Sequence, residues 1–164
     1  YGSLLKVCKD LLHEKIPIVD MLTIIEAVAD IAEFTKAPDI LLEHVRAKLY
    51  RLITQKFKDT DGVLHIVTIK PELEQQFIGK LQEHHGVSQL MVSIAEINNL
   101  VTKTKKLIDE VESKGFSKIC MVVDPVLRKR ISEIYEKFGL QVSVLSHAEL
   151  DSKANFAIEG TLEF

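Results

Sequence analysis

The chain has 164 residues, a length that fits one ordinary domain or two small ones. Apolar residues make up 46% and charged residues 27%, which excludes disordered and collagen-like chains, and every apolar run is broken well before the roughly 18 residues of a bilayer span, so we expect a soluble chain. The formal net charge of −3 argues against a protein that binds nucleic acid by electrostatic attraction.

Residues 1–58 carry the apolar period of helices throughout. The first helical pattern ends at Pro17, Asp20 is suited to cap the second, and Pro38 is suited to begin the third. The third stripe continues from Leu41 to Ile53, so we expect three helices in total. A bundle of this size buries little surface alone, and we therefore expect it to pack on a neighbour.

The apolar period changes at the short polar turn Asp59–Gly62, which predicts a boundary between a helical part, residues 1–58, and an α/β part, residues 59–164. In the second part strand and helix patterns alternate. Strands are predicted over residues 63–69, 119–123, 142–145 and 156–164, and helices over residues 73–84, 94–113 and 125–138. The predicted fold class is α+α/β: a small three-helix bundle followed by a mostly parallel sheet flanked by helices.

The last predicted strand alternates apolar and polar side chains. The pattern places four apolar residues on one face: Phe156, Ile158, Leu162 and Phe164. It places three polar residues on the other: Glu159, Thr161 and Glu163. This alternation is typical of a half-exposed strand, and it predicts a position at the edge of the sheet.

Residues that commonly bind cofactors or metals are sparse. None of the 7 glycines belongs to a phosphate-binding loop, and the chain has no GxSxG motif. His84 and His85 would point about 100° apart on a helix, whereas helical metal pairs are four residues apart, so imidazoles near a helix C-terminus are the favoured interpretation. Cys8 and Cys120 fit buried thiols in a reducing compartment. We expect neither a cofactor nor a metal.

Asp124 is the candidate for enzymatic chemistry. It stands where a buried strand gives way to a helix, at the end of an α/β sheet where ligands usually bind. An aspartate before Pro125 is also explained as the N-cap of that helix, and this second interpretation is favoured.

Two basic clusters occur on predicted helices. The first consists of Lys103, Lys105 and Lys106, and the second of Arg128, Lys129 and Arg130. Glu133 follows Lys129 by four residues and Arg130 by three, so local pairing accounts for part of the second cluster. A solvated helix face is the favoured explanation of both clusters. The alternative is a surface that docks a partner, for which Arg128, Lys129 and Arg130 are the candidates.

Residues 11–30, LLHEKIPIVDMLTIIEAVAD, are distinctive. They resemble the signature LLxEx(V/I)PIxDxxTIxEA(L/I/V)A(D/E) of the export-gate family of type III secretion. The likeness continues through TKAP at 35–38 and LLEHVR at 41–46, which resembles LxExVR. Looser likeness to the family's late "LR" and VLSxxE(L/I) stretches occurs at 124–128 and 144–150, so the resemblance spans nearly the whole chain. The TIxEA form is closer to flagellar members than to virulence-associated ones.

The resemblance implies a place in a larger protein of the bacterial inner membrane. The chain would form the last two of four cytoplasmic subdomains, a helical third and an α/β fourth, and no catalytic residue is implied. In the family the third helps to assemble a nine-membered ring. The fourth is implicated in docking the export ATPase complex and chaperone–substrate complexes, beside other export-gate components. Since the chain begins at Tyr1 without an initiator Met, we expect it to be a piece of a longer protein.

The helical part and the resemblance together predict a ring contact. A small helical unit with exposed charges suits a head-to-tail contact between subunits, and the candidate interface charges are Asp30, Glu33, Arg46 and Lys48. We therefore predict that the face formed by residues 20–53 packs on a neighbouring subunit. The alternative function is a small α/β enzyme or ligand-binding domain that uses Asp124.

Overall fold

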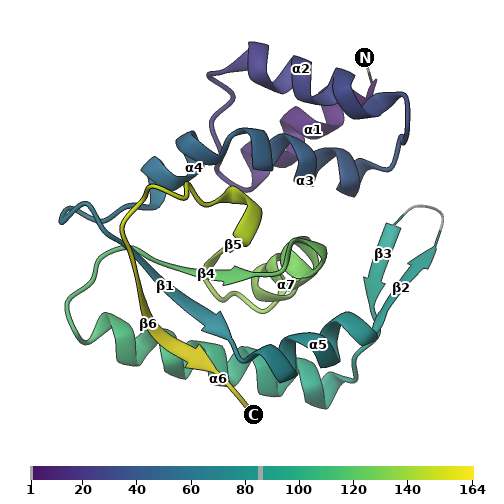
Figure 1. Cartoon of the computed structure of the whole chain (residues 1–164). Helices are drawn as coiled ribbons and strands as arrows, with labels where there is room; N and C mark the ends of the chain where they lie inside the picture. Colours follow the sequence, from purple (N-terminus) through teal and green to yellow (C-terminus); the bar gives the residue numbers. More distant parts are fainter. Residues whose placement is uncertain (1, 85–86) are drawn as a thin grey trace.

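The computed structural model describes residues 2–84 and 87–164. Its helical part comprises α1 (Gly2–His13), α2 (Met21–Ala32), α3 (Pro38–Lys48) and α4 (Tyr50–Phe57), the purple-to-blue helices at the top of Figure 1. Asp20 caps α2 as predicted, because its side chain accepts a hydrogen bond from the backbone N–H of Thr23 at 3.2 Å.

The prediction of one helix over residues 41–53 is wrong. The helix breaks at Leu49, whose φ of −89° and ψ of 20° lie outside the helical range, and α4 begins after it. Leu49 and Ile53 are both buried, so the apolar period continues across the break and gives no sign of it.

The α/β part follows the predicted alternation of strands and helices. Its elements are β1 (Leu64–Ile69), α5 (Pro71–Gly79), β2 (Leu81–His84), β3 (Val87–Leu90), α6 (Ile94–Glu112), β4 (Ile119–Val123), α7 (Pro125–Lys137), β5 (Ser143–Ser146), the 3₁₀ turn η1 (His147–Glu149) and β6 (Phe156–Leu162). Four strands form one sheet in the order β5-β4-β1-β6, and all its pairings are parallel. The predicted fold class is confirmed.

The helix predicted over residues 73–84 is wrong beyond Gly79. The helix α5 ends there, and β2 pairs antiparallel with β3 to form a hairpin. His84 therefore lies on a strand and not near a helix C-terminus, while His85 lies outside the described residues. Most side chains of β2 are exposed, so the sequence lacks the one-sided apolar alternation by which a strand is recognised.

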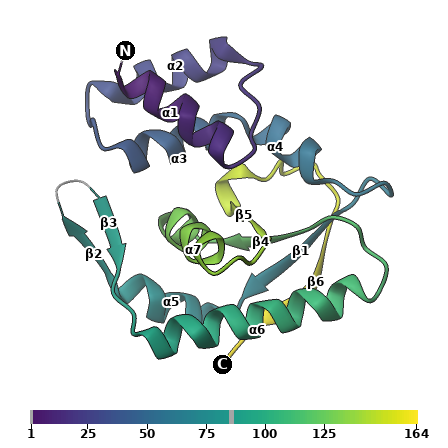
Figure 2. The same cartoon turned by 180° about the vertical axis from the view of Figure 1, so that it is seen from behind.

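The sheet separates two apolar cores. On one face Leu64, Ile66 and Leu145 pack, with other sheet residues, against α1 to α4, which satisfies the expectation that the bundle packs on a neighbour. On the other face α5, α6 and α7 cover the sheet. Figures 1 and 2 show the bundle on one side of the sheet and α5 and α6 on the opposite side. Cys120 lies in the first core, and burial raises the pKa of its thiol to about 12.

The edge position of β6 is confirmed, but its predicted faces are wrong. The register with β1 shifts after Ile158, which pairs with Ile66, so that Gly160 pairs with Val67. This bulge interrupts the alternation, so Leu162 is buried in the core with α6 while Phe156 and Ile158 are exposed. A Cβ atom on Gly160 would stand 2.6 Å from Cδ1 of Leu107, which explains a glycine where α6 approaches β6.

Candidate functional site: the charged junction and its surroundings

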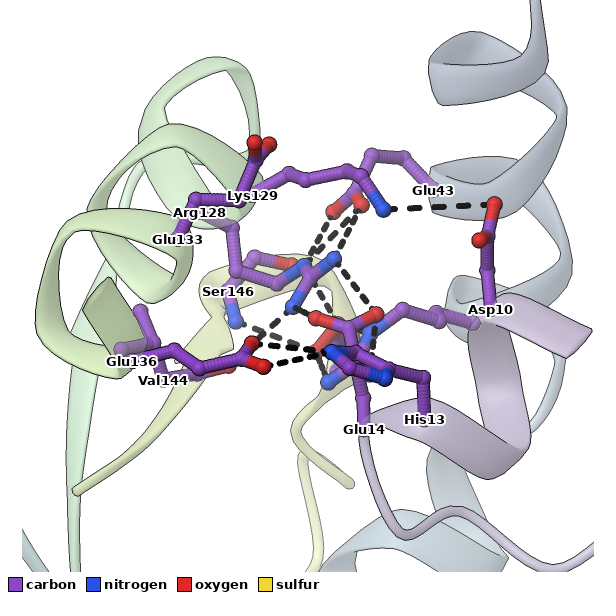
Figure 3. A network of polar contacts seen from close by, with 12 residues as sticks. Asp10, His13, Glu14, Glu43, Arg128, Lys129, Glu133, Glu136, Val144 and Ser146 are labelled. Atoms are coloured by element: carbon purple, nitrogen blue, oxygen red, sulfur yellow. Dashed lines mark hydrogen bonds and ion pairs between the residues drawn. The ribbon is translucent and has the colours of Figure 1, made fainter. Parts of the chain in front are cut away.

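The guanidinium of Arg128 on α7 is fully buried where α7 meets the bundle (Figure 3). Its Nε and Nη2 donate to the two carboxylate oxygens of Glu43 on α3, both at 2.7 Å. Its Nη1 and Nη2 donate to the two oxygens of Glu14, just beyond α1, at 2.6 and 3.1 Å. The prediction that this residue lies on a solvated helix face is therefore wrong. Arg128 instead joins the α/β part to two segments of the helical part.

Arg46 on α3 is buried beside it, although the sequence suggested an exposed charge. Its Nε and Nη2 donate to the carboxylate of Glu149, with 3.1 Å between Nη2 and Oε2, and its Nη1 lies 3.5 Å from Glu14. The same Glu149 carboxylate accepts from the backbone N–H of Ser146 at 3.1 Å, next to the end of β5. We call Glu14, Glu43, Arg46, Arg128 and Glu149 the charged junction.

Sequence reasoning missed the three glutamates, although a signal for them was present. The junction residues occupy the charged letters of the stretches quoted above: the glutamates in LLxEx, LxExVR and VLSxxE, and the arginines in LxExVR and LR. Each junction residue thus falls on a charged letter of these stretches, while other charged letters, such as Asp20 and Asp30, lie outside the junction.

The junction contains three carboxylates and two guanidiniums. The pKa values of two of its carboxylates, Glu14 and Glu43, are shifted in opposite directions. Burial opposes ionisation of Glu14, but the charge and hydrogen bonds of Arg128 outweigh it and hold the pKa of Glu14 below its ordinary value. For Glu43 burial prevails over the hydrogen bonds from Arg128, and repulsion from Glu149 adds to it, so its pKa is raised. Burial alone would lower the pKa of Arg128, but Glu43 and Glu14 raise it and keep the guanidinium charged.

Ion pairs at the margin extend this contact between the two parts. Lys129 lies 3.9 Å from Asp10 on α1, and His13 lies 2.8 Å from Glu136 on α7. Arg130 donates to Asp39 on α3 at 2.9 Å and to the carbonyl of Ser88 on β3 at 2.7 Å, and so connects the hairpin to the bundle. The predicted pairing with Glu133 is confirmed for Arg130, at 2.7 Å.

The other candidate interface charges, Asp30, Glu33 and Lys48, are exposed. Close to Asp30 and Glu33 along the chain, α2 and the segment before it expose apolar side chains to solvent. The exposed fraction is 77% for Val19, 68% for Leu22 and 47% for Ile25. An exposed apolar surface of this kind is typical of an interaction site.

Asp124 is the N-cap of α7, because its side chain accepts from the backbone N–H of Val126 at 3.0 Å. Its own N–H donates to Glu74 at 3.0 Å. The favoured interpretation is confirmed, and these contacts give Asp124 a structural role. Over the described ranges 2–84 and 87–164, no cluster of three or more His, Cys, Asp or Glu has the arrangement of a metal site. Within the same ranges, no helix is both long and apolar enough to cross a bilayer.

The FHIPEP family profile matches residues 1–155 of the chain. The flagellar biosynthesis protein FlhA of Helicobacter pylori (strain J99) is 41% identical over 162 residues, which cover 98% of this chain and 22% of that protein. The chain thus spans about one fifth of the length of this relative. Nonameric EPEC SctV-C superposes with a TM-score of 0.86 at 20% identity, over 98% of this chain and 48% of that one. CdsV of Chlamydia pneumoniae, solved in a complex with CdsO, gives a TM-score of 0.83 at 21% identity, over 99% and 47%.

Proposed function

The chain belongs to the FHIPEP family, and on that premise we propose that it forms the third and fourth cytoplasmic subdomains of a flagellar type III export gate. The membrane anchor would lie in parts of the protein outside this chain, in the bacterial inner membrane. The role is that of a non-enzymatic scaffold for ring assembly and for docking during flagellum assembly. The observation that carries the proposal is the 41% identity to a flagellar FlhA over nearly the whole chain.

A virulence-type secretion gate is the second candidate. SctV-C and CdsV share the fold of this chain almost completely. Their identity of 20–21% is about half of that to the flagellar relative, and this difference favours the flagellar system.

The ring contact is assigned to the face formed by residues 20–53. Support comes from the exposed apolar side chains Leu22 and Ile25, from the exposed charges Asp30, Glu33 and Lys48, and from the nonameric state of SctV-C. Head-to-tail contacts close into a ring when the rotation between subunits allows it. Arg46 is no longer a candidate for the ring contact, because its side chain is buried in the charged junction.

Sedimentation velocity of the complete cytoplasmic region tests this contact. Leu22→Glu places a charge in the exposed apolar surface without touching the core, and it should reduce the assembled fraction at least several-fold. Lys106→Glu on α6, on the opposite side of the sheet, is the control and should leave assembly unchanged. Equal assembly of both variants and the wild type would contradict the proposed contact.

Docking of the export ATPase complex and chaperone–substrate complexes is assigned to the α/β part, residues 59–164. The CdsV–CdsO complex supports a partner of this general kind. Of the candidate docking residues Arg128 is buried, and Lys129 and Arg130 are held in ion pairs, so docking through these three would require the pairs to open.

A capture experiment tests the docking role. The 164-residue chain and the complete cytoplasmic region serve as parallel baits in lysate of the source bacterium, read by mass spectrometry. Removing residues 59–164 is not a sound alternative, because the bundle would lose the sheet that covers its core. Recovery of export ATPase components by both baits supports docking on this chain. Recovery by the complete region alone contradicts it.

A further inference from the structure

A groove with a volume of about 320 Å³ lies between α5 and α6, on the side of the sheet away from the bundle (Figure 2). Side chains of α5, of the first turns of α6 and of Phe164 line it. Phe164 lies two residues beyond the end of β6. The described lining residues belong neither to the charged junction nor to residues 20–53, so the groove is separate from both of those surfaces.

The groove has an apolar floor and no net charge. Leu73 and Phe77 of α5 form the floor, and both are buried. Lys80 of α5 and Glu96 of α6 form an ion pair across the groove. Since these two charges are opposite and the other described lining side chains are uncharged, the groove favours a ligand group that is itself uncharged.

An aromatic ring of the chain itself already lies against this floor. The ring of Phe164 meets that of Phe77 edge to face, with the ring centres 6.1 Å apart and the planes at 88°. The ammonium group of Lys103, one turn beyond Asn99 on α6, lies 5.0 Å from the centre of the Phe164 ring. Both kinds of contact favour aromatic rings over aliphatic side chains of similar size.

Phe164 is held there weakly. Its side chain is 49% exposed, although it contacts a buried ring. The pairing of β6 with β1 ends at Leu162, so the sheet does not fix the position of Phe164. An edge-to-face contact and a cation–π contact each contribute modestly at such an exposed site. Another aromatic ring that makes the same contacts can therefore replace the ring of Phe164.

We propose that this groove binds an aromatic side chain of a partner protein, which contacts Phe77 in place of Phe164. The groove is large enough for such a side chain. Lys103 would lie over the incoming ring as it now lies over Phe164. The exposed amides of Gln76 and Asn99 at the rim can form hydrogen bonds with the backbone of the partner. Phe164 then acts as an internal competitor, and this site does not depend on the scaffold role.

The test titrates the 164-residue chain with N-acetyl-tryptophanamide and follows the backbone amide shifts by NMR. N-acetyl-leucinamide is the matched probe without an aromatic ring. With the aromatic probe the shifts should concentrate at Phe77, Ala95 and Asn99, which line the groove. The aliphatic probe should bind clearly more weakly, because it can make neither the edge-to-face nor the cation–π contact.

Two variants separate the groove from the rest of the surface. Phe164→Ala should strengthen binding of the aromatic probe about two- to tenfold, because the competing ring is removed. Ala95→Leu fills the groove from an exposed position and should weaken binding several-fold without lowering the melting temperature. Ala29→Leu, at an exposed position on α2, is the matched control and should bind as the wild type does.

Each of these readouts can overturn the proposal. It is wrong if the two probes bind equally, if neither binds at millimolar concentration, or if the shifts lie outside α5, α6 and the segment after β6. It is also wrong if Phe164→Ala fails to strengthen binding, or if Ala95→Leu binds as the wild type does. None of these outcomes affects the ring contact of α2.

Discussion

The two faces of the sheet are covered by elements of different chemistry. Toward α5, α6 and α7 the contact is mainly apolar, and it includes a buried polar pair in which the Tyr135 hydroxyl lies 2.8 Å from that of Thr104. Toward the bundle an apolar core of similar kind gives way, at the β5 edge, to the charged junction. The first contact joins elements that alternate along the chain, whereas the second joins the preceding helical part to the α/β part.

This difference shows what buried charge contributes to a contact between parts of a chain. A buried ion pair contributes little net stability compared with apolar side chains of similar volume, but loss of one partner is costly because a charge stays buried alone. Apolar surfaces can pack in several relative orientations, whereas the paired guanidinium and carboxylate geometry of Arg128 with Glu43 fits one. The charged junction therefore defines how the bundle sits on the α/β part.

The largest expected effect is that of breaking the junction. Arg128→Met should lower the free energy of unfolding by about 3–5 kcal/mol, because Glu14 and Glu43 lose their main partner. Urea denaturation measures this loss. The neighbouring control Lys129→Met removes a half-buried ion pair 3.9 Å long and should cost less than about 1 kcal/mol. Equal losses in the two variants would show that the junction is no more important than its margin.

On the face of the sheet covered by α5, α6 and α7, apolar side chains should be able to replace the polar pair of Tyr135 and Thr104 at little cost in stability. Tyr135→Phe alone should cost about 1–2 kcal/mol, because the buried hydroxyl of Thr104 loses its partner. The double variant Tyr135→Phe with Thr104→Val should cost clearly less than the sum of the two single changes. Strict additivity in urea denaturation would contradict this expectation, and with it the contrast between the two faces.

The carboxylates of the junction should respond to pH in opposite directions. The pKa of Glu14 is lowered, so its stabilisation is complete above its ordinary value of 4.5 and is lost as the pH falls through the lowered value. The pKa of Glu43 is raised, so its stabilisation is complete below 4.5 and is lost as the pH rises. The cost of Glu14→Gln should therefore grow from about pH 4 to pH 7, and that of Glu43→Gln should shrink. Urea denaturation of both variants across this pH range measures the two costs. If the two costs change in the same direction with pH, the opposite pKa shifts of Glu14 and Glu43 are wrong.

The smallest effect is expected at the hairpin. Arg130→Gln removes the charged donors that reach Asp39 and the carbonyl of Ser88, and should cost about 1 kcal/mol overall. Amide hydrogen exchange should accelerate in β2 and β3 and stay unchanged in β1 and β4. Lys137→Gln, at the exposed end of α7, should change neither. Unchanged exchange in β3 would mean that its own pairing and packing suffice to hold the hairpin.

Much of the fold could be predicted because its signals are local. Asp20 and Asp124 cap helices in the way that their positions indicated, and the buried strand Ile119–Val123 is an unbroken apolar run. The bulge at Gly160 and the helix break at Leu49 could not be predicted, because the apolar pattern of the sequence continues across both positions.

The charged junction could not be found from local pattern. Its pairs join residues far apart in the chain, such as Glu14 with Arg128 and Arg46 with Glu149. Each arginine has an acidic residue close by in the chain, Glu43 three positions before Arg46 and Asp124 four before Arg128, and neither of these local pairs forms. Only the folded chain brings the actual partners together. The charged letters of the family signature were the available sign that these positions carry a role.

Sedimentation velocity of the complete cytoplasmic region carrying Lys48→Glu tests the proposed ring contact directly. Lys48 is exposed on the face assigned to the ring, whereas Arg46, two residues earlier, belongs to the buried junction. If this surface forms the ring contact, Lys48→Glu lowers the assembled fraction while urea denaturation of the same variant matches the wild type. Unchanged assembly, or a loss of assembly accompanied by an equal loss of stability, would contradict a ring contact on this surface.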